Sequence, residues 1–284
     1  MSNSEAIYYI NGRYVPADDA TLPVGDLAVV RGYGIFDFTR TYQGRPFHLM
    51  DHIARLRYSA AQIKLHIPHS DEEIAEIVFE TVRRNNFAES NIRLVVTGGM
   101  SPNFFTPIDE SSFVVMVTPN TPYAETIYAE GVKLISTRLQ REFPTVKSLN
   151  YIGAIMALRE AAAQGAREAL YVDQNGYISE CTRANFMTLL GNQLIVAKDN
   201  VLAGITQKAV LKLVAEQTDL EIVRRSLHYD ELSQVDEAFY TSSTYEVAPV
   251  VQVDDMVIGS GSVGNVTTNI LNLFRAYAQA GDYI

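Results

Sequence analysis

The sequence is poor in metal-binding side chains. Cys181 is its one cysteine, so neither an intrachain disulfide nor a cysteine-based zinc site can form. The five histidines lack the helical or hairpin pairing typical of metal ligands, and His48 and His52 come without the acidic neighbour of a zincin motif. We therefore expect no metal site.

Long apolar runs and an excess of positive charge are also missing. No apolar run approaches the roughly eighteen residues of a membrane-spanning helix, and the opening MSNSEAIYYINGRYVP has neither the basic nor the apolar region of a signal peptide. The net charge of −10 argues against nucleic acid or an anionic membrane as a partner. We expect a soluble, cytoplasmic protein that binds neither.

The composition does provide for a substantial core. The 284 residues are 47% hydrophobic, which is enough for one large domain or two modest ones. A stretch rich in proline and polar residues, PNTPYAET at 119–126, indicates a connection between a small domain, 1–118, and a larger domain, 127–284. Helical and strand patterns mix without strict alternation, and no glycine-rich fingerprint follows a strand. The predicted fold class is α+β, or irregular α/β, and not a Rossmann sheet.

Hydrophobic periodicity and turn residues predict the individual elements. IYYI and RYVP form a hairpin around Asn11-Gly12, and Asp71 is expected to cap the helix that follows it. The predicted helices cover 50–66, 71–86, 150–164, 206–217 and 263–280. The predicted strands after the hairpin cover 92–99, 112–119, 131–137, 169–173, 176–180, 184–190, 193–197, 221–227, 237–243 and 248–254. The stretches 31–40 and 100–107 are expected to be loops.

Lys147 stands in TVKSLNY, directly before an apolar run. A lysine in such a place is usually a surface residue whose stem covers apolar neighbours. Burial would instead disfavour the ammonium form and lower the pKa of a lysine toward about 7–8, which is what an imine-forming amine requires. The residues around Lys147 leave both interpretations open.

Other stretches carry polar groups that a ligand could use. Glu180 follows a tight turn and is either an edge carboxylate or a partly buried one that needs a cationic partner, such as a protonated pyridine nitrogen. Gly204-Ile205-Thr206 leads into a helix, where backbone N–H groups either bind an anion or are simply capped. The hydroxyls of Thr241 to Thr244 suit a phosphate or a turn. Arg55, on a helix, is by default one half of a surface ion pair.

Taken together and in order, these stretches resemble a known family. RGYGIFDF, HIARL, KSLNY, YISE followed by NF, GIT, TSS and GSVGNVT cover essentially the whole chain. They are similar to the fold-type IV (class IV) pyridoxal-phosphate aminotransferases, the group of D-amino-acid transaminase, branched-chain aminotransferase and aminodeoxychorismate lyase. The resemblance implies a two-domain fold, pyridoxal 5'-phosphate as cofactor and a homodimer.

The resemblance also implies a role for each matching residue. Lys147 would form the internal aldimine and move the proton between the substrate and the cofactor, Glu180 would pair with the pyridine nitrogen, and Tyr151 would hydrogen-bond the phenolic oxygen. Leu202 would pack against the ring. The other cofactor-binding residues that it implies, mainly around the phosphate, are Arg55, Gly204, Ile205, Thr206, Ser242, Ser243 and Thr244.

The substrate-binding part departs from both familiar subgroups. Phe38 stands where branched-chain enzymes have a small glycine, and should fill part of the side-chain pocket. The loop GGMSPNFF lacks the arginine and histidine with which familiar D-amino-acid enzymes bind the α-carboxylate. Arg31 and Arg93 are the candidates to replace them. The expected substrate-binding residues are Arg31, Tyr33, Phe36, Phe38, Arg93 and Thr244.

We therefore expect an aminotransferase that moves the amino group of a D-amino acid to a 2-oxo acid such as 2-oxoglutarate, through a pyridoxamine intermediate. An L-branched-chain-amino-acid aminotransferase is the alternative, and Tyr151 fits it slightly better. An aminodeoxychorismate lyase is a further alternative. A chain that only binds the cofactor or a partner would have no use for both Lys147 and Glu180.

Overall fold

The computed structural model of the protein describes residues 6–281 and 283, which form two compact units. Unit 1 takes the described residues up to Thr121, together with Val146–Asn150 and the residues from Ala278 onward. Unit 2 takes Pro122–Thr145 and Tyr151–Tyr277. The segment that carries Lys147 thus packs with unit 1, although it follows the expected connection in the chain. The domain boundaries at 1–118, 119–126 and 127–284 stay a prediction.

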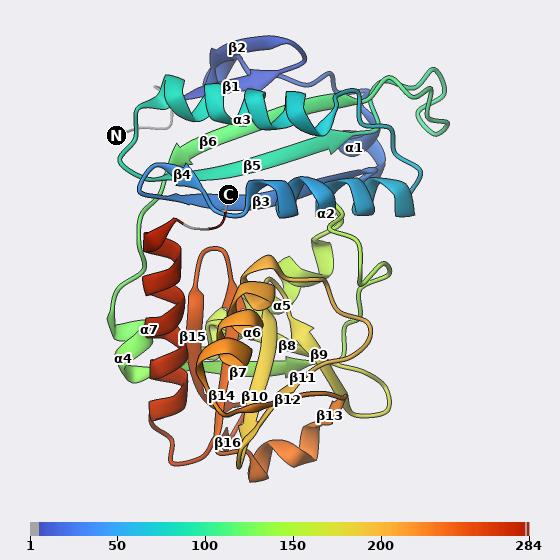
Figure 1. The fold of residues 1–284 in the computed structure, drawn as a ribbon. Helices are drawn as coiled ribbons and strands as arrows, with labels where there is room; N and C mark the ends of the chain where they lie inside the picture. Colours follow the sequence, from blue (N-terminus) through green and yellow to red (C-terminus); the bar gives the residue numbers. More distant parts are fainter. Residues whose placement is uncertain (1–5, 282, 284) are drawn as a thin grey trace. The chain divides into compact units, whose positions relative to one another are not determined.

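Unit 1 is an antiparallel sheet with helices packed on it (Figure 1). Its six described strands run in the order β2-β1-β6-β5-β3-β4. They are β1 (Ile7–Ile10), β2 (Arg13–Pro16), β3 (Gly34–Tyr42), β4 (Arg45–Pro46), β5 (Ser90–Thr97) and β6 (Ser112–Pro119). The helices are η2 (Ala17–Asp19), α1 (Leu27–Arg31), α2 (Leu49–Gln62) and α3 (Asp71–Asn85). Helix α2 packs along β3 and α3 along β6.

The two long helices of unit 1 bury one face each. On α3 the buried residues are Ile74, Val78 and Thr81, whose spacing of three or four places them on one side of the helix. The expected N-cap Asp71 is wrong. Ser70 is the N-cap: its Oγ accepts a hydrogen bond from Glu73 N–H (3.2 Å), and Glu73 Oε2 accepts one from Ser70 N–H (2.7 Å).

Strand β3 corrects the loop expected over 31–40. Every residue of the strand except Phe38 is buried, and the polar residues Asp37, Thr39 and Thr41 are fully inaccessible to solvent. A strand that is covered on both faces shows no alternation of apolar and polar residues, so the period-two pattern that identifies half-exposed strands is absent.

Unit 2 is built on a mixed sheet of ten described strands. Nine run in the order β12-β11-β10-β14-β15-β7-β8-β9-β13, and β16 pairs with β15. They are β7 (Val132–Thr137), β8 (Glu168–Val172), β9 (Tyr177–Cys181), β10 (Asn185–Leu190), β11 (Gln193–Val196), β12 (Glu221–Arg224), β13 (Leu227–His228), β14 (Glu237–Ser242), β15 (Glu246–Val253) and β16 (Met256–Val257). The strand expected over 221–227 is two short strands, β12 and β13.

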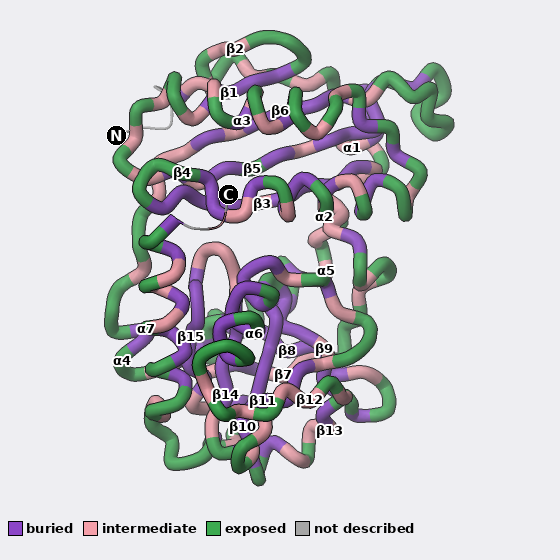
Figure 2. The backbone as a smooth tube through the Cα atoms, in the orientation of Figure 1, coloured by how far each residue is buried: buried purple, intermediate pink, exposed green. Residues whose placement is uncertain are grey.

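The helices of unit 2 connect and cover these strands. They are α4 (Thr126–Glu130), α5 (Ile152–Ala163), α6 (Ile205–Gln217), η3 (Tyr229–Gln234) and α7 (Asn265–Ala280), of which the part up to Tyr277 belongs to unit 2. Figure 2 shows that the buried stretches follow the central strands of each sheet, while helices keep an exposed side. No helix in the described part of the chain is long and apolar enough to cross a membrane.

Two glycines of unit 1 separate the cost of a left-handed backbone from the cost of a clash. Gly99 and Gly44 have φ of +69° and +72°, but a Cβ at Gly99 would lie 1.8 Å from the Glu110 carbonyl oxygen, whereas one at Gly44 would meet nothing within 4 Å. We expect Gly44→Ala to lower the free energy of unfolding by about 1 kcal/mol, the cost of the left-handed conformation. Gly99→Ala should lower it by about 3 kcal/mol or more, because the Glu110 backbone must also move. Chemical denaturation measures both values, and equal losses would contradict the expectation.

Candidate active site

The backbone at Lys147 is fixed against the first residues of β3. Phe36 N–H donates to the Lys147 carbonyl oxygen (2.9 Å), and Leu149 N–H donates to the Gly34 carbonyl oxygen (2.9 Å). The preceding Val146 is 2% exposed and belongs to the core of unit 1. Lys147 is therefore not on a free loop, because the backbone at Lys147 and Leu149 is hydrogen-bonded to β3.

The side chain of Lys147 is half-buried. Its Nζ lies 4.7 Å from the centroid of the Phe36 ring, which places the amine over an aromatic face. Lys147 N–H also donates to Ser59 Oγ on α2 (3.2 Å). The structure thus places this amine at a defined position beside an aromatic ring, intermediate between the two interpretations that the sequence leaves open.

Arg93 lies on the same face of the sheet as two phenylalanines. It is the cross-strand partner of Phe38 in the β3–β5 pair, and Phe36 is two residues from Phe38, so the three side chains share a face. The Arg93 guanidinium carbon lies 5.2 Å from the Phe36 ring centroid and 5.4 Å from that of Phe38. The structure therefore brings together Phe36, Phe38, Arg93 and Lys147 of the expected site.

Arg31 and Tyr33, also expected to bind substrate, lie near the end of α1. Arg31 is exposed and its Nη1 donates to the Val30 carbonyl oxygen (2.7 Å). The Tyr33 hydroxyl donates to the carbonyl oxygen of Ile63 (2.9 Å) just past the end of α2. Tyr33 therefore ties two segments of unit 1 together, and its role in substrate binding stays a prediction.

Arg55 is paired with a buried carboxylate and not with a surface one. Its Nε donates to Asp37 Oδ2 and its Nη2 to Asp37 Oδ1, both at 2.8 Å. The Arg55 side chain is 10% exposed and that of Asp37 is fully buried. The default interpretation of Arg55 as a surface ion pair is wrong.

In unit 2 the carboxylate of Glu180 is nearly inaccessible to solvent, at 4% exposure. Arg141 Nη1 lies 2.6 Å from its Oε1, and Leu202 N–H donates to its Oε2 (3.0 Å). Glu180 is thus the buried carboxylate of the two interpretations, and its cationic partner in the structure is Arg141, while a pairing with a pyridine nitrogen stays a prediction. Arg141 itself was missed, because it stands in a polar stretch, STRLQREF, that matches no motif.

Asn185 connects Glu180 to the start of α6. Its Nδ2 donates to the Leu202 carbonyl oxygen (2.8 Å) and lies 3.4 Å from Glu180 Oε2. Its Oδ1 occupies the space next to Gly204, where a Cβ would lie only 1.8 Å away. Gly204 has an ordinary φ of −73°, so glycine is needed there for space and not for backbone freedom. The stretch NF contains Asn185, but only the resemblance points to it.

The first turn of α6 and the end of β14 carry the donors expected to bind phosphate. Gly204 is the N-cap of α6 and supplies no side chain to cap the first N–H groups, so Ile205 and Thr206 keep donors for an anion. On β14, Thr241 is the cross-strand partner of Asn185, and its Oγ1 is buried without a hydrogen-bond partner among the described residues.

Next to Thr241, the hydroxyls of Ser242 and Thr244 lie 3.2 Å apart, and Tyr245 N–H donates to Ser242 Oγ (3.1 Å). These contacts make a turn, which was the simpler of the two interpretations of the four hydroxyl residues. A buried hydroxyl without a partner and an uncapped helix start nonetheless fit a phosphate.

Tyr151 is the half-buried N-cap of α5, and its carbonyl oxygen accepts from Ile155 N–H (2.9 Å). Near it, burial raises the pKa of Tyr171 to about 12; Arg141 opposes this shift, while Glu180 and Tyr151 add to it. Tyr171 is therefore a neutral phenol beside the carboxylate of Glu180.

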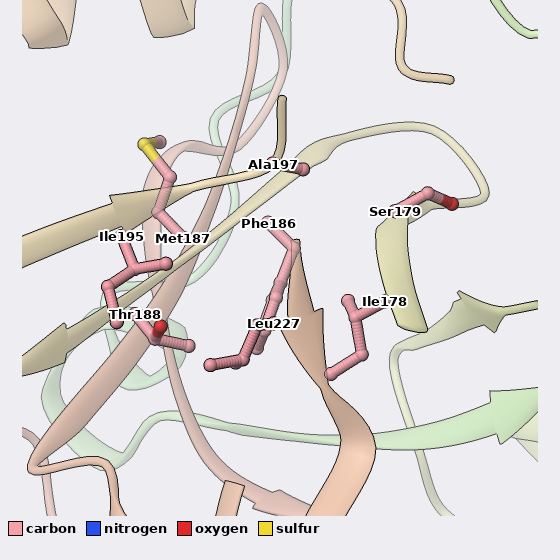
Figure 3. Close-up of a pocket in the computed structure, with 8 residues that line it drawn as sticks. All are labelled: Ile178, Ser179, Phe186, Met187, Thr188, Ile195, Ala197 and Leu227. Atoms are coloured by element: carbon pink, nitrogen blue, oxygen red, sulfur yellow. The ribbon is translucent and has the colours of Figure 1, made fainter. Parts of the chain in front are cut away.

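A small cavity in unit 2 is formed by residues other than those of the expected site. It has a volume of about 10 Å³, close to what one water molecule requires (Figure 3). Its lining is Ile178, Ser179, Phe186, Met187, Thr188, Ile195, Ala197 and Leu227. It is too small for a substrate or a cofactor.

The family described as Amino-transferase class IV matches residues 34–253, well over half of the chain. The chain belongs to the class IV aminotransferases. These are enzymes that depend on pyridoxal 5'-phosphate and act on amino acids and oxo acids, so the predictions of family, enzyme class and cofactor are confirmed.

Individual relatives of this class IV aminotransferase carry two different names. A protein of Methanocaldococcus jannaschii with the provisional name branched-chain-amino-acid aminotransferase is 32% identical over 276 residues, which are 94% of each chain. The D-alanine aminotransferase of Listeria monocytogenes is 30% identical over 272 residues, 93% of each chain.

Solved structures confirm the fold. The branched-chain amino acid aminotransferase of Escherichia coli superposes with a TM-score of 0.91 at 26% identity, covering 97% of this chain and 95% of the other. The T.th. branched-chain amino acid aminotransferase, solved with pyridoxamine 5'-phosphate, gives a TM-score of 0.91 at 27% identity, covering 98% and 96%. The mixed fold predicted from the sequence is that of class IV aminotransferases.

Arg141 should matter for stability because it is the cationic partner of a buried acid. We expect Arg141→Met to lower the free energy of unfolding by about 3–5 kcal/mol, since Glu180 would lose its counter-charge without regaining water. Arg225→Met is the matched control in unit 2, because Arg225 and Glu231 are each about 34% exposed, and it should cost less than about 1 kcal/mol. Urea denaturation compares the two. A loss at Arg141 no larger than that at Arg225 would show that the Glu180 pair contributes little.

Proposed function

We propose that this aminotransferase acts on D-amino acids and passes their amino group to a 2-oxo acid such as 2-oxoglutarate. The observation that carries the proposal is Arg93, whose guanidinium lies against Phe36 and Phe38 on the sheet face beside Lys147. A forked cation near the reactive amine is what an α-carboxylate requires.

Phe38 adds a second argument. In the proposed site its ring would take space that a branched side chain needs, and it is one of the two rings that flank Arg93. Small or linear D-substrates leave room for this ring, whereas leucine and isoleucine compete with it. Arg31, Tyr33 and Thr244 complete the proposed substrate-binding set.

The residues that would hold the cofactor have the properties it needs. Lys147 offers an amine for its aldehyde, Glu180 a buried carboxylate for its ring nitrogen, and Tyr151 a phenol for its ring oxygen. Leu202 would pack on the ring. The phosphate would lie with a guanidinium, the N–H groups at the start of α6, and hydroxyls at and just after the end of β14. These residues are Arg55, Gly204, Ile205, Thr206, Ser242, Ser243 and Thr244.

Bound pyridoxal 5'-phosphate supplies an electron sink for the substrate's α-carbon. The chain's own part is to place and move charge. Lys147 Nζ would take the proton from the substrate's α-carbon and return it to the neighbouring carbon of the cofactor. Glu180, oriented by Arg141 and Leu202, would hold positive charge on the cofactor's ring nitrogen and so make that proton easier to remove.

A branched-chain L-amino acid is the second candidate substrate. The names of the Methanocaldococcus jannaschii relative and of the two structurally similar enzymes favour it. The Listeria monocytogenes relative favours D-alanine at nearly the same identity, so names alone do not decide.

The assembly is part of the proposal as well. Ile152, Ile155 and Met156 on α5 are 73%, 55% and 62% exposed, and three apolar side chains on one short helix support a homodimer. The cytoplasmic location stays a prediction from the sequence.

Lys147→Ala should abolish transamination and the covalent attachment of cofactor, because no other amine stands at that position. Purified variant protein treated with borohydride should carry no reduced cofactor, whereas wild-type protein should. Lys198→Ala, which removes an exposed lysine of unit 2, should behave as wild type. Cofactor reduced onto the Lys147→Ala chain would disprove the assignment.

Half-reactions with single amino acids test the hand of the substrate. We expect D-alanine or D-glutamate to discharge the cofactor's visible absorbance at least about tenfold faster than L-leucine, a difference of about 1.4 kcal/mol in the barrier. Stopped-flow absorbance measures each rate, and 2-oxoglutarate should restore the spectrum. L-leucine reacting faster than both D-substrates would establish the branched-chain alternative.

A further inference from the structure

Asp37, His52 and Arg55 form a buried cluster between β3 and α2 of unit 1. Asp37 is fully buried, and its Oδ1 accepts a hydrogen bond from Phe38 N–H (2.7 Å). His52 Nδ1 lies 2.6 Å from the same oxygen, and since a carboxylate only accepts, this nitrogen carries the hydrogen. With the two bonds from Arg55, both oxygens of the acid are engaged.

Asp37 binds one particular edge of the Arg55 guanidinium. The pair takes Nε and Nη2, which form the side edge of the planar group. The end edge, formed by Nη1 and the second hydrogen of Nη2, takes no part in it. A two-point contact fixes the plane of the group, so the direction of the end edge is set by Asp37.

Besides Asp37, His52 Nδ1 lies 3.4 Å from Arg55 Nη2. His52 is 0% exposed and its Nε2 has no hydrogen-bond partner among the described residues. Burial lowers the pKa of His52, and Arg55 and Lys147 act in the same direction, while Asp37 opposes them. The ring is therefore a neutral donor to Asp37, and a buried imidazole with one unsatisfied nitrogen is retained at some cost.

We propose that Asp37, supported by His52, is a positioning residue that aims the end edge of Arg55 at the phosphate of the cofactor. This rests on the proposed function, in which Arg55 binds that phosphate. Asp37 itself touches neither the cofactor nor the substrate.

The charges of Asp37 and Arg55 decide whether removal of Asp37 should strengthen or weaken phosphate binding. Arg55 holds the pKa of the Asp37 carboxyl well below its usual range, with His52 assisting, against the opposing effect of burial. Asp37 is thus an anion, and as a bare charge it weakens the attraction between Arg55 and a phosphate. Removing it helps phosphate binding if only charge matters and harms it if position matters.

The test compares pyridoxal 5'-phosphate with pyridoxal, which lacks the phosphate. Full-length protein freed of cofactor is titrated with each, and visible absorbance gives the two dissociation constants. The dissociation constant of pyridoxal divided by that of pyridoxal 5'-phosphate measures what the phosphate contributes to binding. In Asp37→Asn the amide nitrogen faces Arg55 Nε, so two donors oppose each other and the side chain must move. We expect the ratio to fall about tenfold, as expected for a long side chain that loses its fixed position, with pyridoxal affinity nearly unchanged.

Three further variants test the role of Asp37. Asp37→Glu keeps a carboxylate and should restore most of the ratio. Asp71→Asn is the matched control, because Asp71 also pairs with an arginine of α2, Arg57, but both side chains are one-third or more exposed. Its ratio should equal that of wild type. His52→Leu removes one donor to Asp37 and should lower the ratio about threefold.

The outcomes separate the positioning role of Asp37 from the proposed binding of phosphate by Arg55. An unchanged or higher ratio in Asp37→Asn, or equal weakening of both ligands, would overturn the positioning role. If Asp37→Asn does not fold, His52→Leu decides in the same way, and an unchanged ratio there overturns it. Arg55→Met tests the proposed function itself. If its ratio equals that of wild type, Arg55 does not bind the phosphate, and the proposed role of Arg55 is wrong whatever Asp37 does.

Discussion

The buried carboxylate of Glu180 is the group on which the arrangement of unit 2 depends. An unpaired carboxylate out of water costs several kcal/mol, and the bonds from Arg141 and the backbone of Leu202 offset that cost. Unit 1 meets the same constraint at Asp37 with Arg55 and His52. In each unit the acid also fixes its partners, because a charged pair with good geometry restrains both sides.

The partners of Glu180 extend that restraint to the start of α6. Leu202 donates its N–H to the acid and accepts from Asn185, and Asn185 in turn fits against the bare Cα of Gly204. The carboxylate of Glu180 and the uncapped start of α6, the proposed anion site, are thereby held at a fixed separation. A ligand with a cationic ring at one end and a phosphate at the other needs that combination, which is why the site fits the cofactor that the family uses.

The sequence predicts most elements and the chemical type of the site, but not its supporting residues. Glu180 and the turn into α6 were found because a turn signal and a helix start are local patterns. Strand β3 was missed because Asp37 and its polar neighbours are buried by residues distant in the chain, which hides the alternation. Arg141 was missed for a related reason: its partner lies 39 residues away, and no local pattern marks such a pair. Ser70 was missed although it is local, because Asp71 is an equally good cap by type alone.

The choice of substrate depends on a smaller set of contacts than the choice of cofactor. Relatives with D-alanine and branched-chain names are 30% and 32% identical to this chain, so overall identity cannot distinguish them. Phe38 and Arg93 are opposite each other on β3 and β5, and the ring proposed to limit side-chain space also contacts the guanidinium. A small residue at 38 would open space for a branched side chain and at the same time loosen the proposed carboxylate contact. If Phe38 and Arg93 bind substrate as proposed, side-chain size and carboxylate binding are coupled through one strand pair, and a change of substrate requires compensating changes on both strands.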